Sequence, residues 1–176
     1  MHTPLQFVIR PLAATEWMLY RDLRLQSLAE SPDAFGSTLE AEAARPDALW
    51  IERLTNASTS GADLPLVAFV GGAPVALLWA KIAPSNNRVA NLYQMWVAPS
   101  HRRLGIAREM LSITAEWAQS KSARAIELGA TCGDTPAQRL YASFGFRPFG
   151  KAIPLREGSS LMAQEMRLNL ASSGGT

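Results

Sequence analysis

Two short segments of the chain contain residue types that can take part in chemistry: one can bind an anion, and the other can donate a proton. The first, Arg102-x-x-Gly105-x-Ala107, follows an apolar run and precedes a helical pattern. Glycine permits close backbone approach, and the free amides and dipole of a first helical turn favour an anion. Arg103 and Arg108 add positive charge. The segment predicts an anion-binding turn, with an ordinary strand-to-helix turn and a solvated basic face as the alternative.

The second segment runs from Asp134 to Phe146 and contains Ala-x-x-Leu-Tyr-x-x-x-Gly-Phe. Pro136 is typical of a helix start and Gly145 of a helix end. Tyr141 lies between them on the apolar face of the predicted helix. A phenol with a pKa near ~10 stays protonated at neutral pH and can donate its proton, so Tyr141 is a candidate general acid. The alternative is a packed core tyrosine.

Taken in order, with one helix and one strand between them, the two segments resemble the acetyl-coenzyme A signature of the GNAT superfamily of N-acetyltransferases. The resemblance extends to Pro32-x-Ala34-Phe35-Gly36-Ser37 and to the last strand, at residues 166–170. It implies one GNAT-like acetyltransferase domain over residues 1–170. Residues 171–176 are small and polar, and they predict a disordered tail.

The resemblance implies acetyl-coenzyme A as co-substrate. Backbone groups of residues 95–97 would pair with its pantetheine arm, and amides of residues 103–108 would hold its pyrophosphate. Asp134 stands where many members have an asparagine that contacts the arm, and an ionised Asp cannot donate a hydrogen bond. The predicted cofactor-binding residues are Met95, Trp96, Val97, Arg102, Arg103, Leu104, Gly105, Ile106, Ala107, Arg108, Asp134, Ala137 and Tyr141.

The implied reaction is direct attack of a primary amine on the acetyl thioester in a ternary complex. Tyr141 would protonate the departing thiolate. Glu40 and Glu127 are candidate bases; the alternatives are an exposed helical residue for Glu40 and an ion-paired strand residue for Glu127. Gln94 could line the acceptor cleft. The acceptor is a small-molecule amine or a protein N-terminal amine, and by analogy with the family the enzyme could be a homodimer. A non-catalytic acyl-coenzyme A sensor is the alternative function.

The elements that must position these residues form an α/β (α+β) domain with a mixed central sheet of about seven strands and helices on both faces. Strands are predicted over residues 7–10, 66–70, 75–82, 91–97, 123–130, 146–149 and 161–168. Helices are predicted over residues 15–29, 39–54, 104–119 and 136–144, the first capped by Thr15 and the second broken at Pro46. Residues 55–64 and 84–88 are predicted loops.

Composition excludes several other classes of protein. A formal net charge of +2 does not favour a nucleic-acid partner. The single cysteine, Cys132, can form neither an internal disulfide nor a Cys-rich zinc site, so no metal is expected, and the composition fits the cytoplasm. The N-terminus lacks a secretory pattern. The most apolar window, residues 65–84, is interrupted by Gly71, Gly72, Pro74 and Lys81, which argues against a membrane span.

Overall fold

The computed structural model describes residues 6–171, so the predicted tail lies outside the described residues except for Ala171. The strands are β1 (Phe7–Pro11), β2 (Asp63–Val70), β3 (Ala73–Ala83), β4 (Asn86–Val97), β5 (Ala125–Thr131), β6 (Arg147–Pro148), β7 (Ile153–Pro154) and β8 (Met162–Asn169). The α-helices are α1 (Trp17–Glu30), α2 (Leu39–Ala43), α3 (Asp47–Ser60), α4 (Ile106–Ser120) and α5 (Pro136–Phe144). Short 3-10 helices cover η1 (Ala14–Glu16), η2 (Pro32–Ala34) and η3 (Pro99–His101).

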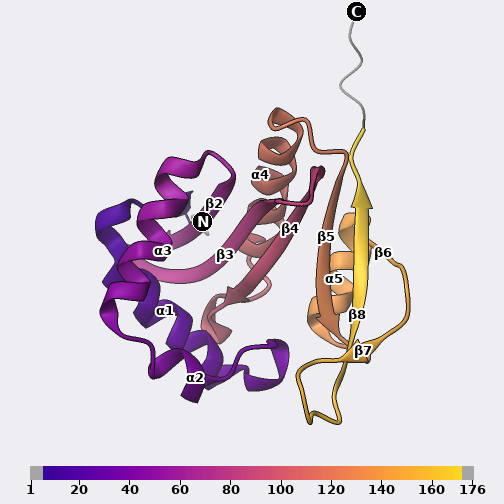
Figure 1. The fold of residues 1–176 in the computed structure, drawn as a ribbon, viewed down its shortest axis with the longest axis horizontal. Coiled ribbons are helices and arrows are strands. Elements are labelled where there is room, and N and C mark those ends of the chain that lie inside the picture. The colour runs from indigo at the N-terminus through magenta and orange to yellow at the C-terminus, as the bar shows by residue number, and fades with distance from the viewer. Residues whose placement is uncertain (1–5, 172–176) are drawn as a thin grey trace, which may run out of the picture.

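The strands join in one sheet with the order β1-β2-β3-β4-β5-β8-β6, and β7 also pairs with β8 (Figure 1). Neighbouring strands are antiparallel except for β4 and β5, which are parallel and are connected through α4. The predicted mixed sheet is confirmed. Over residues 6–171 it has eight strands, not seven, because the short segment Ile153–Pro154 pairs with β8.

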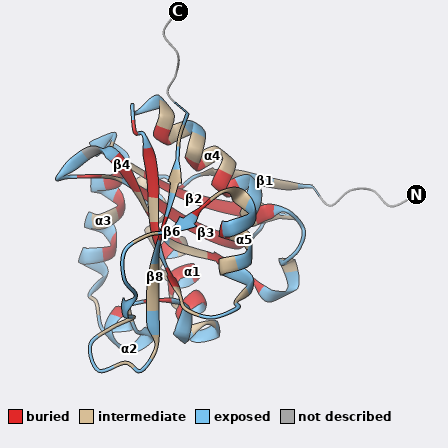
Figure 2. Cartoon of the chain, turned by 90° about the vertical axis from the view of Figure 1, so that its right-hand side faces the viewer, coloured by how far each residue is buried: buried red, intermediate tan, exposed pale blue. Residues whose placement is uncertain are grey.

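The helices form two layers around the sheet. Helix α3 lies on one face and helices α4 and α5 lie on the other, as the side view in Figure 2 shows, and α1 packs against α3. Apolar side chains from both layers and from the central strands form a continuous core, with Trp50, Leu77 and Met110 each at most 1% exposed. Helices on both faces were predicted, and this prediction is confirmed.

The two helices that flank the predicted site begin as the sequence indicates. Thr135 caps α5 by accepting a 3.1 Å hydrogen bond from the Gln138 amide, and Pro136 takes the first helical position. Gly105 precedes α4 with a left-handed backbone, at φ +85°. These local signals fix where the first turns of α4 and α5 lie.

Three local predictions were wrong. Helix α3 continues to Ser60, through most of the predicted loop at 55–64, because buried Ala57 packs into the core and hydroxyls such as Ser58 bond back to the helix. Strand β4 begins at Asn86, so the predicted loop at 84–88 is only a tight turn. Thr15 is not the cap of the first helix; instead, the Glu16 carboxylate accepts a 2.8 Å hydrogen bond from the Ala13 amide.

The two central parallel strands separate soon after they meet. Pairing of β4 with β5 is confined to residues 89–91 of β4 and 125–127 of β5. Beyond this point β4 contains a bulge: it advances three residues, from Tyr93 to Trp96, while β3 advances two. Gln94 lies in the bulge with a left-handed backbone, at φ +58°. A bulge bends its strand and increases the local twist, which accounts for the divergence of β4 from β5.

Candidate active site

A cavity of about 490 Å³ lies where β4 and β5 diverge. Its lining includes Arg24 from α1, Tyr141 from α5, and residues of β4, β5 and β8. Helix α1 packs with α3, on the side of the sheet opposite α5, so the cavity is lined from both faces of the sheet. Two substrates that approach from opposite faces can therefore meet between the diverging strands.

The edge of β4 that faces this cavity is open to hydrogen bonding. On its other edge β4 pairs with β3, with Trp96 opposite Leu77 and Val97 opposite Ala76. Toward β5, the described structure has no strand pairing beyond Asn91. Unpaired backbone groups at a strand edge can bind an extended amide-containing chain as an additional strand. The predicted contact of residues 95–97 with pantetheine fits this edge.

The N-terminus of α4 provides the second part of a cofactor site. Arg103 and Gly105 both have left-handed backbones, at φ +62° and +85°, and both are exposed. No atom lies within 4 Å of the position that a Cβ on Gly105 would take, so the backbone there is open to a ligand. Ile106 is buried and anchors the first turn, while Leu104 is 43% exposed. The amides of residues 105–108 start a long helix and are suited to a pyrophosphate.

Arg102 and Arg108 use their side chains to position this turn. Arg102 donates a 2.9 Å hydrogen bond from Nε to the carbonyl oxygen of Val97 and a 2.7 Å bond from Nη2 to Glu30. Arg108 lies over the Phe144 ring at 5.5 Å and contacts Ser143 Oγ at 3.5 Å, so it connects α4 to α5. Arg102 thus contributes to the predicted anion site mainly by holding the loop against β4 and α1.

Tyr141 lies in the wall of the cavity and is 6% exposed. Its ring packs edge-on against Phe146, with centroids 5.7 Å apart. No hydrogen bond to its hydroxyl is found within residues 6–171. Burial raises the pKa of the Tyr141 phenol above its ordinary value, so the group stays protonated and can donate. The core and general-acid interpretations are therefore compatible, because the ring packs in the core at the edge of the cavity.

The other predicted cofactor contacts in this region are exposed. Asp134 precedes α5, and its carboxylate accepts a 2.6 Å hydrogen bond from Arg139. The side chain is 84% exposed and is committed to this ion pair. Ala137, in the first turn of α5, is also exposed, and its side chain is small. Asp134 is therefore held in an exposed ion pair with Arg139.

The two predicted bases lie in different surroundings. Glu127 lines the cavity, and its Oε1 accepts hydrogen bonds from Nε of Arg167, at 2.8 Å, and from Nη2 of the same residue. Glu40 is exposed at the start of α2 and is not among the residues that line the cavity. The structure therefore brings Glu127, but not Glu40, into the same cavity as Tyr141.

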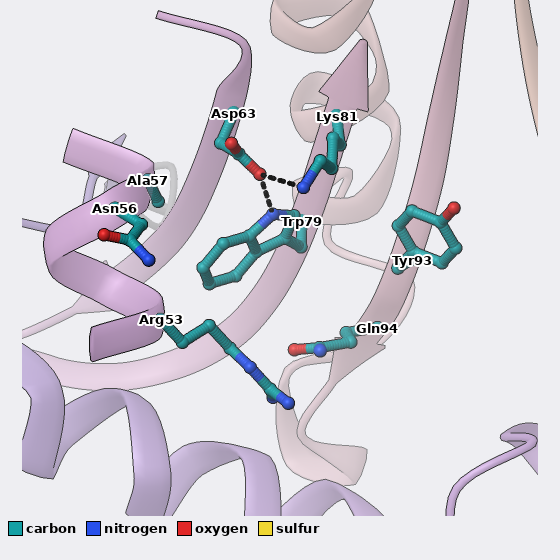
Figure 3. Close-up of a pocket in the computed structure, with 8 residues that line it drawn as sticks. All are labelled: Arg53, Asn56, Ala57, Asp63, Trp79, Lys81, Tyr93 and Gln94. Atoms are coloured by element: carbon teal, nitrogen blue, oxygen red, sulfur yellow. Dashed lines mark hydrogen bonds and ion pairs between the residues drawn. The ribbon is translucent and has the colours of Figure 1, made fainter. Parts of the chain in front are cut away.

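A second cavity, of about 260 Å³, adjoins the first on the side of α3. In Figure 3 the Asp63 carboxylate is bonded to Trp79 and to Lys81, and the side chains of Arg53 and Gln94 point toward each other. Gln94 and Tyr93 line both cavities and form the wall between them. The prediction that Gln94 lines the cleft is supported by its position in this wall.

Sequence reasoning missed several residues that line the main cavity, above all Arg24, Tyr93 and Glu165. A signal for Arg24 was available: it lies four residues after Tyr20 and four before Leu28, on the apolar stripe of α1. All three residues of that stripe are buried. An arginine at such a position is rarely buried without a specific role.

The part of the chain that the structure describes contains neither a candidate metal site nor a candidate membrane-spanning helix. No group of three or more His, Cys, Asp or Glu side chains is arranged to hold a metal ion in that part. No helix among residues 6–171 is long and apolar enough to cross a membrane.

Comparisons with known proteins agree with this geometry. The acetyltransferase (GNAT) family model matches residues 25–146. A GNAT-family acetyltransferase from Streptococcus pneumoniae superposes with a TM-score of 0.78 at 18% identity, covering 94% of this chain and 100% of that one. A putative acetyltransferase from Salmonella typhimurium, solved with its cofactor acetyl-coenzyme A, gives 0.78 at 15% identity, covering 97% and 98%. Spermidine N-acetyltransferase from Vibrio cholerae gives 0.75 at 16% identity, covering 95% and 97%.

The search of curated protein sequences finds no match to this chain. The family model nevertheless covers more than half of the chain, including both segments that carry the predicted site. The open β4 edge, the exposed turn at Gly105 and the buried phenol of Tyr141 fit the co-substrate of that family. The chain therefore belongs to the acetyltransferase (GNAT) family and is an acetyl-coenzyme A-dependent N-acetyltransferase.

Proposed function

We propose that this enzyme transfers an acetyl group to a primary amine by direct attack within a ternary complex. The observation that carries the proposal is the cavity between β4 and β5, which is lined by α1 on one face of the sheet and by Tyr141 on the other. Bound acetyl-coenzyme A supplies a thioester, an activated form of the acetyl group. The pantetheine arm would lie along the open edge of β4 at residues 95–97, with the pyrophosphate at residues 103–108.

The residues of the chain would then divide the work of the reaction. A backbone amide of β4 would donate a hydrogen bond to the acetyl oxygen and stabilise the charge that develops there. The amine nitrogen forms a bond to the acetyl carbon, the carbon–sulfur bond breaks, and the sulfur leaves with the electron pair. Tyr141 would supply the proton that the sulfur takes up, because its raised pKa keeps the phenol protonated.

The amine must also lose a proton. An alkyl amine with a pKa near ~10.4 is neutral in only roughly one molecule in 10³ at pH 7. Of the two predicted bases only Glu127 lines the cavity, so we assign it the role of proton acceptor, with Arg167 holding its carboxylate in place. Glu40 has no role in this proposal.

Two acetyltransferases of similar structure support an amine as the acceptor. One is the Vibrio cholerae spermidine N-acetyltransferase in complex with CoA and spermine. Another is a ribosomal-protein-alanine N-acetyltransferase from Brucella melitensis, which gives a TM-score of 0.75 at 20% identity. The acceptors of these two enzymes are thus a polyamine and an alanine of a ribosomal protein. We also infer cytoplasmic placement, supported by the single cysteine, and a homodimer by analogy with the family.

An assay of free-thiol release tests the function. Purified enzyme, acetyl-coenzyme A and a panel of primary amines are mixed, and thiol release is followed together with the mass of the acetylated amine. Release that depends on both substrates, with a mass gain of one acetyl group, is expected for at least one amine. If the enzyme binds acetyl-coenzyme A but acetylates none of them, the alternative of an acyl-coenzyme A sensor is favoured. Light scattering of the pure protein tests the homodimer.

A further inference from the structure

Arg24 is a buried cation that lacks a partner for part of its guanidinium group. It is 3% exposed, and its Nε has no hydrogen-bond partner within residues 6–171. Nη1 makes one long contact, of 3.5 Å, with Ser27 Oγ. The guanidinium lies over the ring of Phe35, with Cζ 4.6 Å from the ring centroid. Arg24 and Phe35 both line the main cavity, so the unpartnered group belongs to the wall of the proposed acceptor site.

The charges around Arg24 do not neutralise it. The nearby carboxylate of Glu42, itself 3% exposed, lies 3.2 Å from Arg45 and 3.6 Å from Arg53. No ion pair of Arg24 within 4 Å is found in the described chain. Burial lowers the pKa of Arg24, and attraction from Glu42 counteracts this, so the guanidinium remains charged. Three guanidinium groups thus share one carboxylate, and Arg24 is the one of the three that lines the main cavity.

The part of the cavity wall formed by β5 and β8 contains two carboxylates, one of which, Glu127, is paired with Arg167. Glu127 of β5 and Glu165 of β8 both line the cavity. In the β5–β8 pairing Glu127 lies opposite Arg167 and Gly129 lies opposite Glu165, which places the two carboxylates on one face of the sheet. A molecule between the walls would therefore contact a guanidinium on the α1 side and carboxylates on the β5–β8 side.

We propose that Arg24 binds a carboxylate of the acceptor, so that the substrate is a free amino acid or a similarly small amine that carries a carboxylate. The inference rests on the proposed acetyl transfer and names the substrate class of that site. The acceptor carboxylate would pair with Arg24, and its ammonium group would lie toward Glu127. A polyamine carries only positive charges and would leave the Arg24 guanidinium without a partner. A protein N-terminus has no carboxylate next to its amine.

Matched acceptors test the proposal. Thiol release is measured with each L-amino acid, with its carboxamide, and with spermidine. For the best amino acid we expect kcat/KM at least about tenfold above that of its carboxamide, because the carboxamide leaves the buried guanidinium unpaired. Arg24→Met should remove this preference without changing the Kd for acetyl-coenzyme A. Arg21→Met is the control, since Arg21 lies on the same helix but pairs with Asp22 and Asp47.

Stability gives a readout that does not depend on turnover. Removing an uncompensated buried charge should leave the Tm of Arg24→Met unchanged or raised, whereas an arginine that only supports the fold would lower it. Amino acids should raise the Tm of the wild type but not that of Arg24→Met. If carboxamides or spermidine react as well as amino acids, or if both proteins gain the same stabilisation from amino acids, the proposal is wrong. A wild type that binds amino acids but releases no thiol would contradict acetyl transfer and leave the Arg24 assignment supported.

Discussion

The Tyr20 hydroxyl donates a 3.0 Å hydrogen bond to Oε1 of Gln94, the residue whose left-handed backbone forms the bulge in β4. Tyr20 is fully buried and also accepts a 3.2 Å bond from Arg53. Helix α1 therefore holds the β4 bulge where the strand leaves β5. The two residues are 74 positions apart in the chain, and their contact links the helical layer to the shape of the cavity.

Tyr20→Phe should lower the stability of the enzyme and weaken acceptor binding. The change leaves the ring in place but removes one partner each from Gln94 and Arg53, which should reduce the free energy of unfolding by about 1–3 kcal/mol. The KM for the acceptor should rise, whereas the Kd for acetyl-coenzyme A should not change. Urea unfolding and steady-state kinetics check this. In Tyr93→Phe, which alters a half-exposed tyrosine, stability should be unchanged; equal losses in both variants would contradict the argument.

Gly105→Glu should abolish binding of acetyl-coenzyme A. The new carboxylate would extend into the open space before α4 and repel the pyrophosphate, and a side chain at φ +85° adds backbone strain of about 1 kcal/mol. Calorimetry measures the binding. Gly61→Glu is the control: it introduces the same charge at φ +65°, at the end of α3. Retained binding in Gly105→Glu would show that the anion does not lie at this turn.

Tyr141→Phe should lower kcat at least roughly tenfold, because general acid catalysis typically contributes 10²–10⁴-fold. The packing of the ring against Phe146 is kept, so the Tm and the Kd for acetyl-coenzyme A should be those of the wild type. Single-turnover measurements isolate the chemical step. An unchanged rate of the chemical step would show that Tyr141 is only a packed core residue and not the general acid.

The value of kcat/KM should rise toward alkaline pH as the acceptor amine loses its proton. A descending limb caused by loss of the Tyr141 proton should be absent below about pH 10, because burial raises the pKa of Tyr141 and a raised pKa keeps an acid protonated up to a higher pH. The measurement is a rate profile from about pH 6 to 10 with one acceptor. A fall near pH 8 in the wild type that disappears in Tyr141→Phe would contradict a raised pKa.

Glu16→Gln should destabilise the fold by about 1–2 kcal/mol at pH 7, a value reduced for partial exposure of the ion pair. Two hydrogen bonds from Arg10, of 2.7 and 2.8 Å, are the main cause that lowers the pKa of Glu16 from 4.5 to about 2. A lowered pKa contributes stability that is complete above pH 4.5 and is lost as the pH falls toward 2. Urea unfolding should thus show wild type and variant converging in acid. Glu116→Gln, at an exposed site on α4, should have no such effect.

Much of the site could be predicted because its signals are local. A glycine before α4 and a threonine and proline before α5 determine where these helices begin, since capping and backbone conformation depend on neighbouring residues. The break at Pro46 was predicted for the same reason, and α3 starts at Asp47. The predicted loop at residues 55–60 was wrong, because the burial of Ala57 in helix α3 outweighs the polar composition of this segment.

The sequence by itself thus determined the class of fold, the turns that precede α4 and α5, and the place of Tyr141 on the apolar face of α5. Only the tertiary structure decided that Glu127 is paired with Arg167, that Glu40 lies outside the cavity, and that Arg24 lies in its wall. These relationships depend on strand register, on the bulge in β4 and on the packing of α1 against the sheet. Contacts across 40 or more positions are set by the whole packed core, and no local pattern encodes them.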